Sequence, residues 1–411
     1  MLISFSIENW MSFKDKVTMS MIASQQTTFG DRLARTKNKL RVLPLAAIYG
    51  GNASGKSNLC HAFKFAKKLI VEGTKKDQKI DASPFALCKE NRESPCNFWF
   101  VMLAENENMY EYSFSVDNKQ VHKEKLIKIR SSTEEVLFER VLNEFPVIGN
   151  DERLRLTSEN TRKNQLFLTN TIEQNQDIYE DVYSWFRERL KIITPISTFE
   201  FESMLPLSDP WFQNYVEKLK YLDTGISRVE EELVDNTIVP ASREGRYWVE
   251  VMSKEKFVRH DEGGKEVYKK LVTYHKCHDG EEVQFELRQE SDGTIRLMDI
   301  LPAFISSKDG AKEIIIIDEI DRSLHHVLIR RLLEHYLQSC DSKTRKQVMF
   351  TTHDLLLMDQ ELMRRDEMFL VERDSNGESC IKSINDFKGL RIDKDVRKSY
   401  LLGRFGGIPK L

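Results

Sequence analysis

A glycine-rich segment at residues 46–57 places the strongest constraint on how this chain can fold. A short apolar run, Ala-Ala-Ile-Tyr, leads there into Gly-Gly-Asn-Ala-Ser-Gly-Lys-Ser, which has the pattern G-x-x-x-x-G-K-S. Glycines at both ends of the pattern let successive N–H groups turn inward around phosphate oxygens. Residues 58–70 are rich in helix formers, and the N-terminal dipole of such a helix would face the same anion. Strand, loop and helix therefore occur in the order that a phosphate-binding P-loop requires.

Individual residues of this segment have separate expected tasks. Lys56 supplies a cation for the outer phosphates of a nucleotide, and the hydroxyl of Ser57 is a candidate ligand for Mg²⁺. The alternative is a glycine–serine surface loop that matches the pattern by chance, and the flanking strand and helix argue against it. The expected nucleotide-binding residues are Gly50, Asn52, Ala53, Ser54, Gly55, Lys56, Ser57 and Asn58.

The composition is that of a globular protein with room for two or three lobes. The chain has 411 residues, of which 40% are hydrophobic and 31% charged. A net charge of −3 gives no overall basic signature, so binding to nucleic acid would need a local patch. No apolar run is long enough to span a membrane, and the N-terminus lacks the features of a signal peptide. Six scattered cysteines without C-x-x-C spacing predict reduced thiols in a cytoplasmic protein.

Alternation of apolar and polar residues predicts strands in the first third of the chain. An N-terminal hairpin is expected from 2–7 and 17–22, and a second hairpin with an aromatic-rich sequence from 97–103 and 109–116. Two further alternating segments extend the second sheet. They are residues 121–129 and 133–141.

The middle of the chain has helical periodicity over residues 157–185 and 209–233. We interpret the apolar face of the second segment as core packing. Strand-like alternation returns at 243–251, 265–276 and 281–289. Lysine and arginine are dispersed through 120–165 and 241–276, where a solvated face is the first expectation and a nucleic-acid or partner surface the alternative. The predicted apolar helix face consists of Phe212, Tyr215, Val216, Leu219, Leu222 and Ile226.

A second strong motif follows at residues 314–319. Four consecutive isoleucines fit a strand buried on both faces of a parallel sheet, and Asp318 and Glu319 follow at its C-terminal end. Ligands bind at that end of the strands in open α/β sheets. We expect Asp318 to hold Mg²⁺, directly or through water, and Glu319 to act as the catalytic base that accepts a proton from the attacking water.

Two further segments complete the candidate site. Residues 347–354 predict another short buried strand that ends in a histidine, and His353 would lie beside the γ-phosphate and the attacking water. The alternative for this histidine is a structural role. Before the apolar run 298–305, Ser291 or Asp292 can cap a helix whose exposed N–H groups form an anion site. A simple helix cap is the alternative there.

The order of these segments resembles that of the ABC-type ATPases, which include the RecF, SMC and Rad50 groups. Asn9-Trp10-x-Ser12-Phe13 before the P-loop is similar to their N-terminal hairpin. The resemblance implies that Ser291 and Gly293 belong to a signature motif, which closes on the nucleotide held by the P-loop of a second copy. The turn at 320–326 matches the D-loop, which also crosses the dimer interface. The Leu-Ser-Gly-Gly-Gln of transporter subunits is absent, and there is no sustained heptad pattern.

One subgroup is similar over almost the whole chain: the compact ATPases of bacterial phage-defence systems such as PARIS, Septu and abortive-infection systems. This resemblance implies an oligomeric sensor ATPase that holds or activates a separate nuclease effector. We find no nuclease motif in the chain itself. The segments that carry the resemblance are 1–5, 222–226, 291–294, 318–321, 323–325 and 399–409.

Taken with this resemblance, the sequence predicts an α/β, ABC-type P-loop nucleotide-binding fold with a mixed β-sheet and a largely helical insertion. The expected regions are 1–116 with the P-loop, an insertion at 117–240, and 241–411 with the signature motif, the Asp-Glu strand and His353. The expected cofactors are ATP and Mg²⁺, in a homodimer or larger oligomer with ATP at the interface. The alternative function is a DNA-repair or recombination ATPase of RecF or Rad50 type that binds DNA directly.

Overall fold

The computed structural model describes residues 1–130, 133–195, 210–222, 224–233, 257–262, 265–305, 312–387 and 395–405, with backbone alone for 257–262 and 265–268. The predicted strand at 243–251 lies outside these residues. The chain divides into two compact units, each of which is described by itself. The first comprises Met1–Ile192, Gly310–Asp318 and Leu337–Leu411, and the second comprises Ile193–Asp309 and Glu319–Tyr336. The boundaries of the three regions expected from the sequence stay a prediction.

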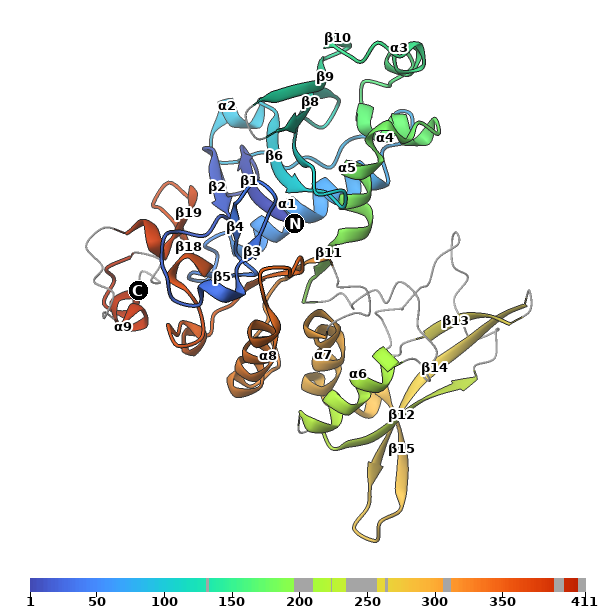
Figure 1. Cartoon of the computed structure of the whole chain (residues 1–411), viewed down its shortest axis with the longest axis vertical. Helices are drawn as coiled ribbons and strands as arrows, with labels where there is room; N and C mark the ends of the chain where they lie inside the picture. Colours follow the sequence, from blue (N-terminus) through green and yellow to red (C-terminus); the bar gives the residue numbers. More distant parts are fainter. Residues whose placement is uncertain are drawn as a thin grey trace. The chain divides into compact units, whose positions relative to one another are not determined.

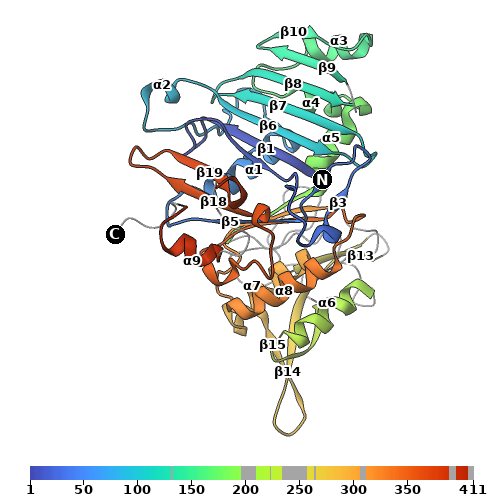
Figure 2. The ribbon, with the colours of Figure 1, turned by 60° about the vertical axis from the view of Figure 1, so that its left-hand side comes forward.

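The first unit contains an antiparallel sheet with the strand order β10-β9-β8-β7-β6-β1-β2 (Figure 2). The predicted strands of the first third of the chain are confirmed here. The pairing of β1 with both β2 and β6 joins the two predicted hairpins into one sheet. The strands are β1 (Leu2–Glu8), β2 (Val17–Ser20), β6 (Cys96–Leu103), β7 (Met109–Val116), β8 (Val121–Ile129), β9 (Glu134–Val141) and β10 (Glu144–Val147).

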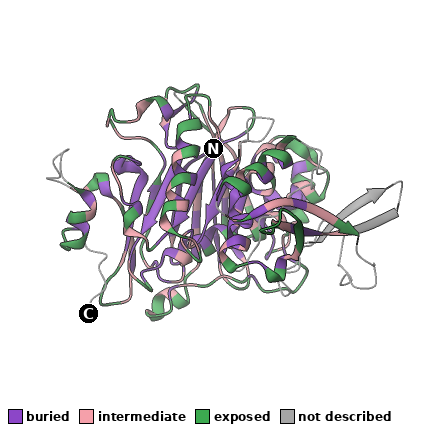
Figure 3. Cartoon of the chain, turned by 90° about the horizontal axis from the view of Figure 1, so that it is seen from below, coloured by how far each residue is buried: buried purple, intermediate pink, exposed green. Residues whose placement is uncertain are grey.

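A second, mixed sheet has the order β11-β16-β17-β5-β18-β19. The pairs β16–β17, β17–β5 and β5–β18 are parallel, and β19 pairs antiparallel with β18. Every residue of β5, β16 and β17 is buried, as expected for strands covered on both faces (Figure 3). The strands are β5 (Leu45–Tyr49), β11 (Leu190–Ile193), β16 (Ile314–Ile317), β17 (Gln347–Thr351), β18 (Met368–Arg373) and β19 (Ser379–Ser383).

Helix α1 (Lys56–Val71) packs its apolar face against the antiparallel sheet (Figure 1). Its Phe63 ring lies 4.0 Å from Phe5 of β1, and Phe65 lies 4.8 Å from Trp10, measured between ring centroids. These contacts hold the middle of α1, the helix that follows the P-loop, against the N-terminal hairpin. The other described helices and short strands of this unit are α2 (Lys89–Arg92), α3 (Glu152–Glu159), α4 (Phe167–Glu173), α5 (Glu180–Ser184), α9 (Val396–Leu401), β3 (Ala34–Arg35) and β4 (Arg41–Val42).

The second unit contains a small antiparallel sheet in which β14 pairs with β12, β13 and β15. Helix α7 continues directly into the 3₁₀ turn η5 (Leu301–Phe304), and α8 begins within this unit. The bounds of these elements, and of the remaining helix α6, are α6 (Pro210–Tyr221), β12 (Ile226–Leu233), β13 (Phe257–Glu262), β14 (Lys265–Lys276), β15 (Glu282–Glu286), α7 (Asp292–Ile300) and α8 (His326–Ser339).

The prediction of one helical segment over 209–233 is wrong beyond Tyr221. Gly225 has a φ of 74°, a left-handed conformation that glycine adopts freely and that does not continue an α-helix. Ile226 then begins β12, which pairs along its length with β14. The apolar spacing that extended the helix to Ile226 therefore spans a helix, a turn and the first residue of a strand. The other five members of the predicted face are buried on or just after α6, as expected.

Candidate nucleotide-binding site

The P-loop connects β5 to α1 through backbone conformations that favour glycine at two positions. A Cβ atom at Gly50 would lie 2.3 Å from the main-chain oxygen of Val371, so no larger residue fits there. Gly55 has a φ of 115° and is packed against the side chains of Ser12 and Ser379. Because Gly55 has no side chain, the N-terminus of α1 has no side-chain cap. The glycines thus bring the loop close to its neighbours and leave the helix terminus available to a ligand.

The donors of this loop fit phosphate oxygens. The buried Nζ of Lys56 donates to the main-chain oxygens of Gly50, at 2.8 Å, and Gly51, at 2.9 Å. The hydroxyl of Ser54 is buried and has no hydrogen-bond partner among the described residues. A lysine ammonium, a buried hydroxyl and an uncapped helix N-terminus together form a donor set suited to a polyphosphate. The structure therefore brings together the loop residues that the sequence singled out.

The two predicted metal ligands, Ser57 and Asp318, lie side by side. The Ser57 hydroxyl donates to Oδ1 of Asp318 at 3.3 Å, and the hydroxyl of Thr351 donates to the same oxygen at 2.6 Å. Asp318 is 3% exposed and Thr351 is fully buried. One hydroxyl and one carboxylate at the ends of α1 and β16 are oxygen ligands of the kind that Mg²⁺ prefers. Burial, together with the nearby Asp318 carboxylate, raises the pKa of the Cys60 thiol, which therefore stays protonated.

The two predicted catalytic side chains both follow buried strands. Glu319 comes directly after Asp318 and has a φ of 51°, an uncommon backbone conformation for a residue with a side chain. Its main-chain oxygen accepts from Nη2 of Arg296 at 3.2 Å, and its carboxylate lies 3.9 Å from Nη1 of Arg322. His353 is exposed and follows β17 by two residues. The Glu319 side chain is 36% exposed, and the catalytic roles of both residues stay predictions.

The candidate signature residues lie at the start of α7, in the second unit. Of the two possible caps, Ser291 is the one used: its hydroxyl accepts from the N–H of Thr294 at 3.0 Å. A Cβ atom at Gly293 would lie 2.8 Å from the main-chain oxygen of Ser323, so glycine permits close packing between α7 and the predicted D-loop turn. Ser323 itself has a φ of 61°. The start of α7 and this turn are therefore in close contact.

Sequence reasoning missed several side chains that contact the P-loop. The indole N–H of Trp10 donates to the main-chain oxygen of Asn58 at 3.0 Å, and the Asn58 amide donates to the Ser12 hydroxyl at 2.8 Å. Ser379 of β19 donates to the main-chain oxygen of Ser54 at 2.6 Å. The Asn9-Trp10-x-Ser12 pattern indicates the hairpin but not these contacts. Ser379 lies more than 300 residues from the loop, and no local pattern distinguishes it.

The fold and the geometry of this site are those of an ABC-type P-loop nucleotide-binding protein. The strand before the P-loop, the Asp-Glu strand and the strand before His353 are parallel neighbours, and their polar residues lie at one edge of the sheet. The family is shown by sequence: the chain belongs to the family described as "AAA domain, putative AbiEii toxin, Type IV TA system", whose model matches residues 45–359. No curated protein matches the chain.

Solved structures with distant similarity include SMC head domains and the recombination mediator protein RecF. An SMC head domain from Thermotoga maritima is 13% identical, with a TM-score of 0.39 over 93% of this chain and 98% of that one. An Smc head domain derived from Pyrococcus furiosus is 12% identical, with a TM-score of 0.40 over 98% of both chains. The RecF–ATP structure is 12% identical, with a TM-score of 0.37 over 93% of this chain and 99% of that one. These TM-scores are too low to support an argument. The fold is therefore assigned from the strand order of this chain and from its family.

Among the described residues, no helix combines the length and the apolar character needed to cross a bilayer.

Proposed function

We propose that this protein binds ATP with Mg²⁺ and hydrolyses the γ-phosphate bond. The observation that carries the proposal is the convergence of Ser57, from the first turn of α1, and Thr351, from the end of β17, on one oxygen of Asp318. This arrangement joins the phosphate-binding loop to the acidic strand, and such a junction is what a nucleotide–metal complex requires.

Each residue of the proposed site has a task that follows from its chemistry. Lys56 and the N–H groups of the loop hold the phosphates. Ser57 and Asp318 hold Mg²⁺, which neutralises charge on the phosphates and on the leaving group. Glu319 accepts a proton from the attacking water, and His353 contacts the γ-phosphate. The remaining proposed contacts to the nucleotide come from Asn52, Ala53, Ser54 and Asn58.

We further propose that two copies of the chain enclose two ATP molecules. Ser291 and Gly293 of one copy would complete the site of the other, because the N-terminus of α7 can present N–H groups to an anion. The close packing of Gly293 on Ser323 supports this proposal, since it links the signature residues to the predicted D-loop. ATP would then favour the closed dimer and hydrolysis would release it, so that the nucleotide acts as a conformational switch.

In the cell, we propose, this switch acts in the cytoplasm as a sensor or scaffold of bacterial antiviral defence that controls a separate nuclease effector. The chain belongs to a family whose description includes a putative toxin of a toxin–antitoxin system. This membership supports a role in defence. The similarity of the segments 318–321, 323–325 and 399–409 to phage-defence ATPases is the second support.

A DNA-repair or recombination ATPase of the RecF or Rad50 type is the alternative. It would bind DNA directly, through a local basic surface, because the net charge of the chain is −3. DNA binding that requires ATP and weakens steeply with salt would favour this alternative over a defence sensor.

The test of the ATPase proposal is nucleotide binding by the wild type and by Lys56→Ala. We expect Lys56→Ala to lose ATP binding because the outer phosphates lose their cation. Lys64→Ala is the matched control, since Lys64 is an exposed lysine on the same helix. Wild-type affinity for ATP in Lys56→Ala, or the same loss in both variants, would contradict the assignment of the P-loop.

A further inference from the structure

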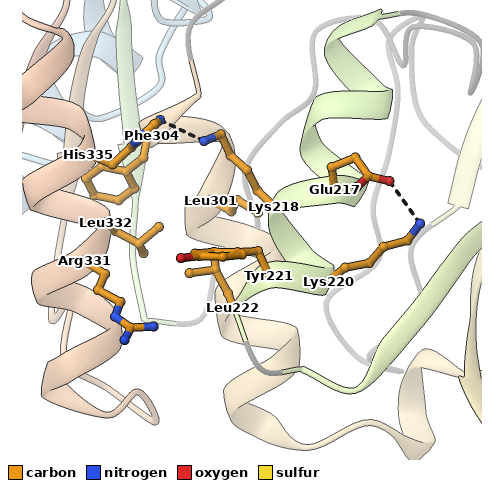
Figure 4. A pocket seen from close by; sticks show the side chains of 10 residues that line it. All are labelled: Glu217, Lys218, Lys220, Tyr221, Leu222, Leu301, Phe304, Arg331, Leu332 and His335. Carbon is orange, nitrogen blue, oxygen red and sulfur yellow. Dashed lines mark hydrogen bonds and ion pairs between the residues drawn. The ribbon is translucent and has the colours of Figure 1, made fainter.

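The second unit contains a cavity of about 670 Å³ that the nucleotide site does not use (Figure 4). Helix α6, the turn η5 and helix α8 line it. Its apolar wall is formed by Leu222, Leu301, Phe304 and Leu332, none of which is more than 9% exposed. Both the volume and the mainly apolar wall lie within the range of sites for small organic molecules.

The charged side chains around this cavity are mostly cationic. Lys218, Arg331 and His335 line it, and Glu217 is the one carboxylate among its lining residues. Glu217 is already paired with Lys220 at 3.0 Å. Among the described residues, Arg331 has no hydrogen-bond or ion-pair partner. The cavity therefore places basic groups next to an apolar wall without an acid to neutralise them.

Two of these basic groups are in direct contact. Nζ of Lys218 lies 2.8 Å from Nε2 of His335. A lysine ammonium can only donate, so His335 is neutral and accepts through Nε2. Burial lowers the pKa of Lys218, and burial together with Lys218 lowers the pKa of His335. A negative group in the cavity would accept from Lys218 and favour its charged form, while neutral His335 remains the acceptor of the second lysine hydrogen bond.

An exposed aromatic side chain adds a second recognition element. Tyr221, at the end of α6, is 78% exposed and projects from α6 toward α8 in Figure 4. A flat apolar group between the Tyr221 ring and the apolar wall would be removed from water on both faces.

We propose that this cavity is a binding site for a small organic anion with a flat apolar body. The body lies against Leu222, Leu332 and the Tyr221 ring, and the carboxylate, phosphate or sulfonate group is held by Lys218 and Arg331. His335 is a positioning residue, because its contact with the lysine keeps the ammonium at the cavity. This proposal does not depend on the proposed ATPase activity.

The test uses 8-anilino-1-naphthalenesulfonate, a flat apolar anion whose fluorescence rises when it leaves water. We expect saturable binding at one site of the folded full-length protein. In Lys218→Gln/Arg331→Gln the dissociation constant should rise by at least about ten-fold, because two charge-assisted hydrogen bonds are lost. Lys276→Gln, which removes an exposed lysine on β14 of the same unit, is the matched control and should bind as the wild type does.

N-phenyl-1-naphthylamine, which has a similar ring system and no charge, separates anion recognition from general apolar binding. Its affinity should be the same in the wild type and in the double variant. Hydrogen exchange should show that the sulfonate protects amides of α6, η5 and α8. Equal affinity of the sulfonate for the wild type and the folded double variant, or protection confined to other elements, would overturn the proposal.

Discussion

The hydroxyl oxygen of Thr351 lies 2.6 Å from Oδ1 of Asp318, and both side chains are buried. Thr351 ends β17 and Asp318 follows β16, and these two strands are parallel neighbours in the mixed sheet. The hydrogen bond therefore fixes the orientation of the carboxylate that is proposed to hold Mg²⁺. The Ser57 hydroxyl contacts the same oxygen, so Thr351 positions one of the two proposed metal ligands against the other.

The first prediction concerns this contact. Thr351→Val keeps the shape of the side chain and removes its O–H group. A hydrogen bond to a charged group contributes about 1.5–3 kcal/mol, so the Mg²⁺ concentration for half-maximal ATP turnover should rise by at least about ten-fold. Thr351→Ser retains the hydroxyl and should behave like the wild type. A titration of ATPase activity with Mg²⁺ measures the effect, and equal Mg²⁺ requirements for the wild type and Thr351→Val would exclude a positioning role.

The second prediction concerns Glu319. Glu319→Gln should bind ATP as the wild type does and should hydrolyse it about 10²–10⁴ times more slowly, the range for loss of a general base. Steady-state phosphate release measures the rate, and nucleotide binding is measured separately. Glu361→Gln changes an exposed carboxylate of the first unit and should turn over ATP normally. Unchanged turnover in Glu319→Gln would assign the base to another group.

The third prediction concerns a buried carboxylate away from the site. Burial raises the pKa of Glu367 to about 7, although Arg32 lies 3.0 Å from its Oε2 and opposes the shift. Its other oxygen, Oε1, is buried without a partner among the described residues. A pKa raised on folding means that this group contributes stability at low pH and loses it as pH rises through about 7. The free energy of unfolding should therefore fall as pH rises from about 4.5 to about 7 and level off above that.

Glu367→Gln should remove most of this pH dependence, which amounts to up to about 3 kcal/mol for a shift of this size. Urea unfolding at several pH values between 5 and 8 measures it. Glu361→Gln, at an exposed position of the same unit, should leave the pH dependence unchanged. If Glu367→Gln and the wild type lose stability equally with rising pH, the carboxylate of Glu367 is already ionised throughout this range.

The fourth prediction concerns Glu124, a fully buried residue of β8. Its carboxylate accepts from the N–H groups of Phe167 and Leu168, at 2.6 and 2.9 Å, and from the Tyr112 hydroxyl at 2.9 Å. Arg140 lies 3.8 Å away. Glu124→Leu leaves the start of α4 and the arginine without this acceptor and should destabilise the protein by about 3–5 kcal/mol.

Chemical denaturation of Glu124→Leu checks this value. Glu134→Leu, at an exposed position of the neighbouring strand β9, is the control and should change stability little. A loss below about 1 kcal/mol in Glu124→Leu would show that water or another group takes over the contacts of the carboxylate.

Local sequence is sufficient to predict the strands and the helix that contain the site residues. It is insufficient to predict the contacts between these elements. The apolar strands at 45–49, 314–317 and 347–351 and the start of α1 follow from residue type and order alone. The spacing of Ile226 fits the helical period, whereas Gly225 with its positive φ and the pairing of β12 with β14 decide its structure. Ser12, Thr351 and Ser379 contact the site only because distant strands meet, and no local pattern contains that information.

The central claim is that ATP joins two copies of this chain without the help of DNA. The mass of Glu319→Gln in solution, with and without ATP and Mg²⁺ and with and without DNA, tests it most directly, because slow hydrolysis preserves the ATP-bound state. We predict a monomer without nucleotide and a dimer or larger assembly with ATP and Mg²⁺ alone. A monomer that associates only when ATP and DNA are both present would contradict the claim and favour a DNA-repair ATPase.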